Sequence, residues 1–216
     1  MLSAIRNPKR VGLALVVCLA AGVPQKAAAS DLEFWGLFAR KAHFTAELSN
    51  AETVPLVPDR GFSGTARAWL SFGRDGLVLK YKIESDMDLN AGFPATEDEA
   101  DDVTQIHLHA APPGIAGPHV LNVYKAPAQD DDDLLVRPNQ GIVMGIWDDE
   151  DLSEGLPPGP ASVPLSEALA ELCDGEVYVN VHGTGDQGTG ALRGNLEPTR
   201  RGRSVCRFLR LKGDIF

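Results

Sequence analysis

Basic residues are in the minority in this sequence, with 20 Lys and Arg against 30 Asp and Glu. After the first 29 residues, which are interpreted below as a signal peptide, 16 basic and 30 acidic residues remain, a net charge of −14. A surface of that sign repels phosphate groups, which argues against a nucleic-acid partner and against an anionic-membrane partner. This part of the sequence also lacks an apolar run long enough to cross a bilayer, so we predict no transmembrane segment in the mature chain.

Signatures of nucleophilic catalysis and of phosphate binding are missing as well. Ser166 and Ser204 have no Gly-x-Ser-x-Gly context. The glycine-rich segment 183–190 joins two expected strands and does not open a helix, as a phosphate-binding loop would. The sequence therefore favours a binding or structural module over an enzyme.

Acidic residues gather in three runs, at 97–102, 130–133 and 148–151. None has the Asp-x-Asp-x-Asp-Gly spacing that wraps a calcium ion. Like charges at that density repel one another, so we interpret the runs as solvated loops. Adhesion or matrix association through these loops is a further class of function that the sequence leaves open.

The first 29 residues have the three-part layout of a secretory signal peptide. Arg6, Lys9 and Arg10 give a positive start, residues 11–23 form an apolar run, and Ala27-Ala28-Ala29 is a small-residue cleavage signal. The run is shorter than the ~20 residues of a spanning helix, although a retained N-terminal anchor is the alternative. We predict cleavage after Ala29 and a secreted or periplasmic mature protein.

Two of the three cysteines, Cys173 and Cys206, follow the predicted cleavage site. In an oxidising compartment such a pair is a candidate disulfide, here one that ties the C-terminal tail to the segment before the strand at Tyr178. The sequence gives no distance between the two residues, and disulfide geometry is strict, so a bonded and a free pair both remain open.

Short alternating segments separated by Gly, Pro and Asp predict an all-β fold of about eight strands. The expected strands are 43–50, 64–72, 77–84, two within the strand–loop–strand unit at 103–124 of which the second is 120–124, 141–147, 176–181 and 190–196. One short helix is expected at 165–173, where three leucines fall on one side. This pattern predicts an antiparallel β-sandwich or Greek-key barrel, followed at 198–216 by a basic C-terminal tail.

Four of the five histidines lie in two stretches of the sequence. His107, His109 and His119 belong to a strand–loop–strand unit at 103–124, and His182 ends the strand at 176–182. Side chains two apart on a strand share a face, so His107 and His109 point the same way. In the later strand, Tyr178, Asn180 and His182 share the polar face.

Imidazole is a good ligand for copper, zinc and nickel. If the two strands lie side by side, His107, His109 and His182 are candidate metal ligands, with His119 as a fourth. The alternative is that these residues decorate the sheet and bond to one another. His43 is interpreted as an ordinary residue at a strand edge, and Arg193 as a structural arginine that caps carbonyl groups.

Three segments in order resemble the CHRD domain, a family first described in chordin and also found in bacterial exported proteins. They are FTAELS at 44–49 with Val54-Pro55, IHLH at 106–109 with Gly117-Pro118, and YVNVH at 178–182 with Arg193-Gly194. The resemblance implies an immunoglobulin-like β-sandwich or barrel and no settled biochemical activity. It divides the chain into a signal peptide (1–29), an N-terminal segment (30–42), a CHRD domain (43–197) and the tail (198–216).

A second resemblance is to the copper/zinc superoxide dismutases, to which CHRD domains have been likened in fold. His107-Leu108-His109 is similar to their copper-binding His-x-His strand, and Gly117-Pro118-His119 to a segment of their zinc-binding loop. Val181-His182 is similar to the strand that carries their last copper ligand. The resemblance gives an alternative to the binding or structural module: a copper-binding, superoxide-dismutase-like protein that uses His107, His109 and His182, with His119 as a fourth residue. A bridged second metal is not expected, because the full set of zinc-loop histidines is missing, and the sequence by itself identifies no cofactor.

Overall fold

The computed structural model describes residues 41–72, 76–89, 101–124, 133–151, 162–186, 188–213 and 215. The chain divides into two compact units, 1–36 and 37–216, and all of the described residues belong to the second. The predicted signal peptide at 1–29 lies outside the described residues, as do parts of the acidic runs.

Ten strands are described in this unit: β1 (Phe44–Leu48), β2 (Gly64–Phe72), β3 (Leu77–Ser85), β4 (Val103–Ala110), β5 (His119–Tyr124), β6 (Leu135–Arg137), β7 (Ile142–Trp147), β8 (Val177–Gly183), β9 (Leu192–Asn195) and β10 (Glu197–Pro198). The helices are α2 (Leu165–Asp174), α3 (Arg200–Lys212) and two 3-10 turns, η1 (Asn50–Glu52) and η2 (Pro138–Gln140). None of the helices in the described part of the chain has the length and apolar character needed to cross a bilayer.

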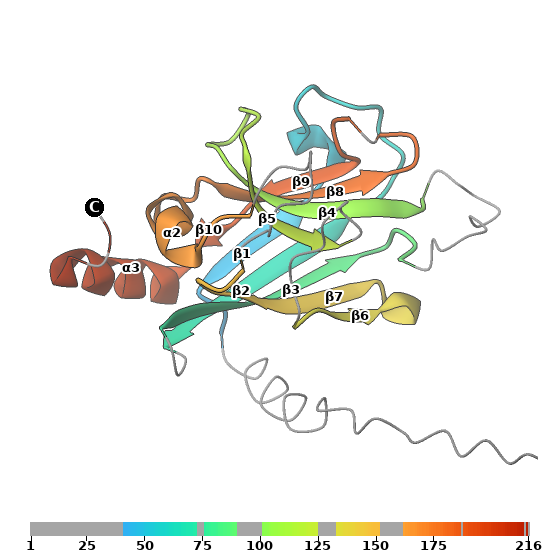
Figure 1. The fold of residues 1–216 in the computed structure, drawn as a ribbon. Coiled ribbons are helices and arrows are strands. Elements are labelled where there is room, and N and C mark those ends of the chain that lie inside the picture. Colours follow the sequence, from blue (N-terminus) through green and yellow to red (C-terminus); the bar gives the residue numbers. More distant parts are fainter. Residues whose placement is uncertain are drawn as a thin grey trace, which may run out of the picture. The chain divides into compact units, whose positions relative to one another are not determined.

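The strands form two antiparallel sheets (Figure 1). The larger sheet has the order β10-β1-β2-β3-β7-β6, and the smaller has the order β5-β4-β8-β9. A bridge between Ser49 and Arg193 joins the end of β1 to β9. The prediction of an all-β sandwich with a short helix is confirmed.

Alternation along the strands sends one set of side chains into a shared core. In β1, Phe44, Ala46 and Leu48 are buried while the residues between them are half-buried or exposed. The same cluster takes Trp147 from the larger sheet and Leu108 from the smaller one. Full burial of a large apolar side chain stabilises a fold by about 1.5–3 kcal/mol, so this core holds the two sheets face to face.

Helix α2 begins one residue after Pro164 and matches the expected helix to within one residue at its end. Its leucine face, Leu165, Leu169 and Leu172, is buried. Gly175 ends it in the left-handed conformation at φ 77°, where glycine carries no side-chain penalty.

Helix α3 lies within the segment 198–216 that the sequence predicts to be a basic tail. Thr199 caps its first turn by accepting a hydrogen bond from the Gly202 N–H, and Gly213 ends it in the left-handed conformation. Its buried face consists of Gly202, Cys206 and Leu209, at the i, i+4, i+7 spacing of a helix. Only one of these three is a large apolar residue, which is why the periodicity is weak in the sequence.

Cys173 and Cys206 form a disulfide, with Cα atoms 5.6 Å apart. It joins the end of α2 to the middle of α3, which confirms the pairing that the sequence left open. Arg210 of α3 also donates to the Asp174 carboxylate. The C-terminal helix is therefore fixed to the body of the unit by a covalent and a charged contact.

Candidate metal centre

Strands β4 and β8 are neighbours in the smaller sheet and pair in antiparallel register. The register sets His109 opposite Tyr178 and His107 opposite Asn180. Opposite residues in a sheet share a face, so the polar faces of the two strands are one surface. The expectation that these strands, far apart in the sequence, lie side by side is confirmed.

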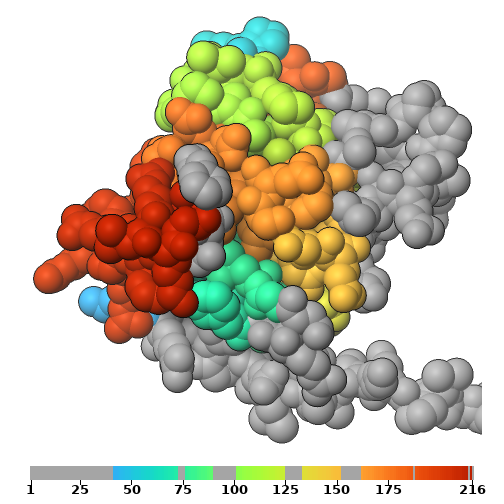
Figure 2. All heavy atoms as spheres, turned by 60° about the vertical axis from the view of Figure 1, so that its left-hand side comes forward, coloured from blue at the N-terminus to red at the C-terminus, as the bar shows by residue number. Residues whose placement is uncertain are grey.

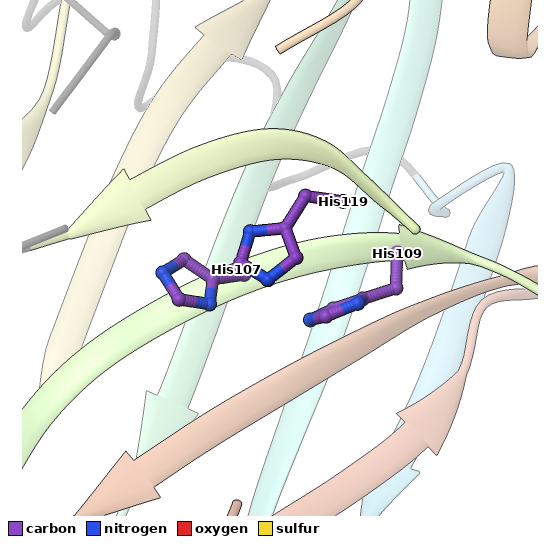
Figure 3. Close-up of side chains that lie close together, drawn as sticks. All are labelled: His107, His109 and His119. Carbon is purple, nitrogen blue, oxygen red and sulfur yellow. The ribbon is translucent and has the colours of Figure 1, made fainter. Parts of the chain in front are cut away.

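Strand β5 flanks β4 on the other side and brings His119 opposite His109. Two register shifts between β4 and β5 accompany this pairing. The His119 ring lies 4.1 Å from the His107 ring and 4.1 Å from the His109 ring, centroid to centroid, and Figure 3 shows the three rings close together. His119 thus spans the gap between the two β4 histidines, whose own centroids are 5.8 Å apart.

The three histidines can each offer one ring nitrogen so that all three atoms lie within 4.8 Å of one another. Atoms with that spacing share a point about 2.8 Å from each, against the ~2.0–2.1 Å of a zinc–nitrogen bond. An ion bound at that point would require each nitrogen to lie about 0.7 Å closer to it. We call these three residues the histidine triad.

Burial keeps the triad neutral. His107 is 3% and His109 is 7% exposed. Burial, with the neighbouring imidazoles adding to it, lowers the pKa of His107 to about 2. Burial likewise lowers the pKa of His109 to about 4, although the bond to Gly117 acts the other way, and it lowers the pKa of His119. A neutral imidazole retains the lone pair that a metal ion needs.

Hydrogen bonds fix which nitrogen is available. The Gly117 carbonyl oxygen lies 3.0 Å from His109 Nδ1 and can only accept, so Nδ1 carries the proton and Nε2 the lone pair. His119 Nδ1 lies 3.2 Å from Asn122 Oδ1, which selects the same tautomer. Such a bond on the far nitrogen is how metal-ligating histidines are usually oriented.

Three ring nitrogens of the triad are buried and make no hydrogen bond with any described residue: both nitrogens of His107 and Nε2 of His109. A buried polar group without a partner costs about 1–3 kcal/mol. A metal ion bound by the triad would engage the nitrogen that His109 has available and one of the two on His107.

His182 lies beside the triad but outside it. Its ring centroid is 5.1 Å from that of His107, and the Asn180 amide nitrogen lies 3.1 Å from its Nε2. The strand register sets His182 opposite Gln105, one step along the same face from His107. The set that converges in the structure therefore contains His119 in place of His182, whereas the sequence predicts His182 as the third ligand and His119 only as a fourth.

Two further residues support the triad, and the sequence singled out neither for this role. The Tyr178 ring stacks on His109, and its hydroxyl accepts a bond of 3.2 Å from the Gly117 N–H. The Arg193 guanidinium lies 3.6 Å from the Tyr178 centroid and donates to the Pro112 carbonyl. Arg193 therefore caps a carbonyl as expected, and the loop is bonded at Pro112 to Arg193 and at Gly117 to Tyr178 and His109.

His43, the fifth histidine, takes no part in the site. Its Nδ1 accepts a hydrogen bond of 2.9 Å from the Leu70 N–H, between β1 and β2. It is thus a structural residue at the strand edge, as the sequence indicated.

A family model described as CHRD domain matches residues 44–196. The match includes all three triad residues and His182. A search of curated proteins and a search of solved structures each found no match. The resemblance to copper/zinc superoxide dismutases therefore stays a prediction.

Proposed function

This chain belongs to the CHRD domain family, and we propose that it is an exported CHRD module that binds one transition-metal ion. Membership of the family supports a binding or structural module. The observation that carries the metal proposal is the histidine triad: three neutral imidazoles with ligand atoms within 4.8 Å of one another.

The donor set favours copper, zinc or nickel over calcium or magnesium. Imidazole suits zinc, copper and nickel, whereas calcium and magnesium prefer oxygen ligands. The group of described residues that converges here contains no carboxylate. Three histidines leave a fourth coordination position, which zinc sites of this kind fill with water or a substrate atom. His119 is the half-buried member of the triad and lies nearest to solvent.

Export is the second part of the proposal. The Cys173–Cys206 disulfide supports an oxidising compartment, because thiols stay reduced in most cytosols. The positively charged start, apolar run and small-residue site at 1–29 support a cleaved signal peptide. N-terminal sequencing of the protein recovered outside the cytoplasm should begin at Ser30. A sequence beginning at Met1 would contradict cleavage.

The metal is tested by stripping the purified protein with a chelator and titrating it with Zn²⁺ and, separately, Cu²⁺. One ion per chain is expected by elemental analysis after removal of excess metal. His107→Gln and His109→Gln should each lower the affinity at least about 100-fold, because each removes a ligand. Circular dichroism checks that the variants are folded.

The matched control is His43→Asn, which removes a histidine outside the triad and retains an acceptor for the Leu70 N–H. Its metal content should equal that of the wild type. Metal binding that survives in His107→Gln and His109→Gln would place the ion elsewhere. If the folded wild-type protein bound neither ion, the metal proposal would be wrong and the chain would be a structural module.

A further inference from the structure

Helix α3 concentrates positive charge in a chain that is acidic as a whole. Its 13 residues hold six of the 20 basic residues and no acidic one. Arg210 pairs with Asp174. The other five are exposed on the helix: Arg200, Arg201, Arg203, Arg207 and Lys212.

The outward face of the same helix carries two large apolar side chains. Leu211 is 82% exposed and Phe208 is 47% exposed. They are three positions apart and therefore adjacent on the helix surface, among the basic residues. Lys212 lies over the Phe208 ring, with its Nζ 4.7 Å from the ring centroid. Figure 2 shows α3, in red, on the surface of the unit.

Described contacts on the inner side and at the first turn of the helix hold it in place. The disulfide to Cys173, the burial of Leu209 and the Thr199 cap all lie away from the outward face. An amphipathic peptide that folds on binding must be ordered at that moment, which weakens its binding. Helix α3 is already folded when its outward face meets a partner.

We propose that α3 docks the protein on an anionic lipid surface, with Phe208 and Leu211 entering the headgroup region and the arginines contacting lipid phosphates. Basic residues near an anionic leaflet each strengthen binding, and apolar side chains among them add burial. This binding surface is separate from the histidine triad and does not depend on it.

The net negative charge does not oppose this docking at close range. Charges in physiological salt are screened over ~8 Å, so the lipid surface interacts mainly with the residues that touch it. More distant acidic residues disfavour other orientations, which directs α3 toward the surface. The expectation from net charge, that anionic membranes are avoided, applies to the chain on average but not to this helix.

The apolar pair favours lipid over nucleic acid. Phosphate contacts alone would explain five exposed basic residues. They would leave Leu211, the most exposed large apolar residue in the described part of the chain, without a role. A lipid surface accounts for both kinds of side chain.

The test is sedimentation of the full chain with vesicles of phosphatidylcholine, with and without phosphatidylglycerol. Binding should require phosphatidylglycerol and should fall at about 1 M NaCl, where the screening length is ~3 Å. Arg200→Gln with Arg207→Gln should lower the salt-sensitive binding about 25-fold, since each basic residue contributes about fivefold. Phe208→Ser with Leu211→Ser should also weaken binding.

The matched control is Lys82→Gln with Arg137→Gln, the same charge change on β3 and on β6. Strand β6 is at the opposite edge of the larger sheet from β10, which leads into α3. This control should change binding less than about twofold. The proposal would be overturned if the Arg200→Gln with Arg207→Gln variant bound the vesicles as well as the control variant. It would also be overturned if the wild type showed no salt-sensitive vesicle binding. Retention on double-stranded DNA that is unaffected by Phe208→Ser with Leu211→Ser would likewise overturn it.

Discussion

The imidazole of His109 lies flat against the phenol ring of Tyr178, with centroids 4.8 Å apart and ring planes 6° apart. Arg193, from the strand on the other side of β8, stacks on the same phenol ring. Three neighbouring strands therefore contribute to one stack that ends at a candidate ligand. A ring held on one side by Tyr178 and at Nδ1 by Gly117 is oriented before any ion arrives, which lowers the cost of binding.

Two replacements of Tyr178 distinguish the contribution of the ring stack to metal affinity from that of the hydrogen bond. Tyr178→Phe retains the ring and loses only the bond from the Gly117 N–H, so metal affinity should fall less than about tenfold. Tyr178→Leu loses the ring and leaves the Arg193 charge without its aromatic face. We expect a further fall of about tenfold, measured by competition with a zinc chelator. Equal affinities for the two variants would show that the stack does not position His109.

A methyl group at Gly117 would overlap the Ala110 carbonyl oxygen, which is backbone and cannot move aside alone. Gly117→Ala should therefore displace the carbonyl that holds His109 Nδ1 and lower metal affinity about 10–100-fold. Gly114→Ala is the control in the same loop, because its added methyl meets nothing within 4 Å and only the positive φ of 77° is unfavourable. Its affinity should match the wild type, and equal effects of the two would contradict this role for Gly117.

His182 lies one step along the face from the triad and should contribute less than its members. His182→Gln removes the imidazole that Asn180 contacts but leaves three ligands in place. We expect affinity to fall no more than about tenfold, against at least about 100-fold for His107→Gln. The same metal titration compares the two variants. A larger loss of affinity for His182→Gln than for His107→Gln would indicate that the metal centre lies closer to β8.

The disulfide should account for a measurable part of the stability. Its cysteines are 33 positions apart, and closing a loop of that size stabilises a fold by about 3–4 kcal/mol. Cys173→Ser with Cys206→Ser should lower the free energy of unfolding by roughly that amount in urea. A loss below about 1 kcal/mol would indicate that α3 is held by its other contacts.

The sequence predicts some of these features and not others, for physical reasons. The alternation of Ile106 and Leu108 with His107 and His109 predicts which side of β4 faces the core. It does not predict how β5 pairs with β4 or where His119 lies, because Gly117-Pro118 breaks the pattern before His119. The register shifts arise in the pairing of the two strands, which the sequence does not show. Helix α3 was missed because its inner face is mostly small, so tertiary contacts and a disulfide hold it instead of a strong apolar stripe.

Acid should destabilise the metal-free protein through the triad. The pKa of His107 is about 2 and that of His109 about 4 in the folded protein, against 6.5 for an ordinary histidine. Below pH 6.5 the unfolded chain therefore binds protons that the folded chain does not, and stability is lost as the pH falls. Between pH 7 and pH 5 each histidine should remove about 2 kcal/mol. His119, whose pKa is also lowered, acts in the same direction.

Urea unfolding of chelator-treated protein at the two pH values measures this loss, and His107→Gln with His109→Gln provides the comparison. Carboxylates elsewhere titrate equally in both proteins. The difference between wild type and variant in how the free energy of unfolding depends on pH therefore comes from the two histidines. The variant should lose about 4 kcal/mol less than the wild type between pH 7 and pH 5. Matching losses would mean that the two rings take up protons between pH 7 and pH 5 as readily in the folded protein as in the unfolded chain, so that burial does not lower their pKa values.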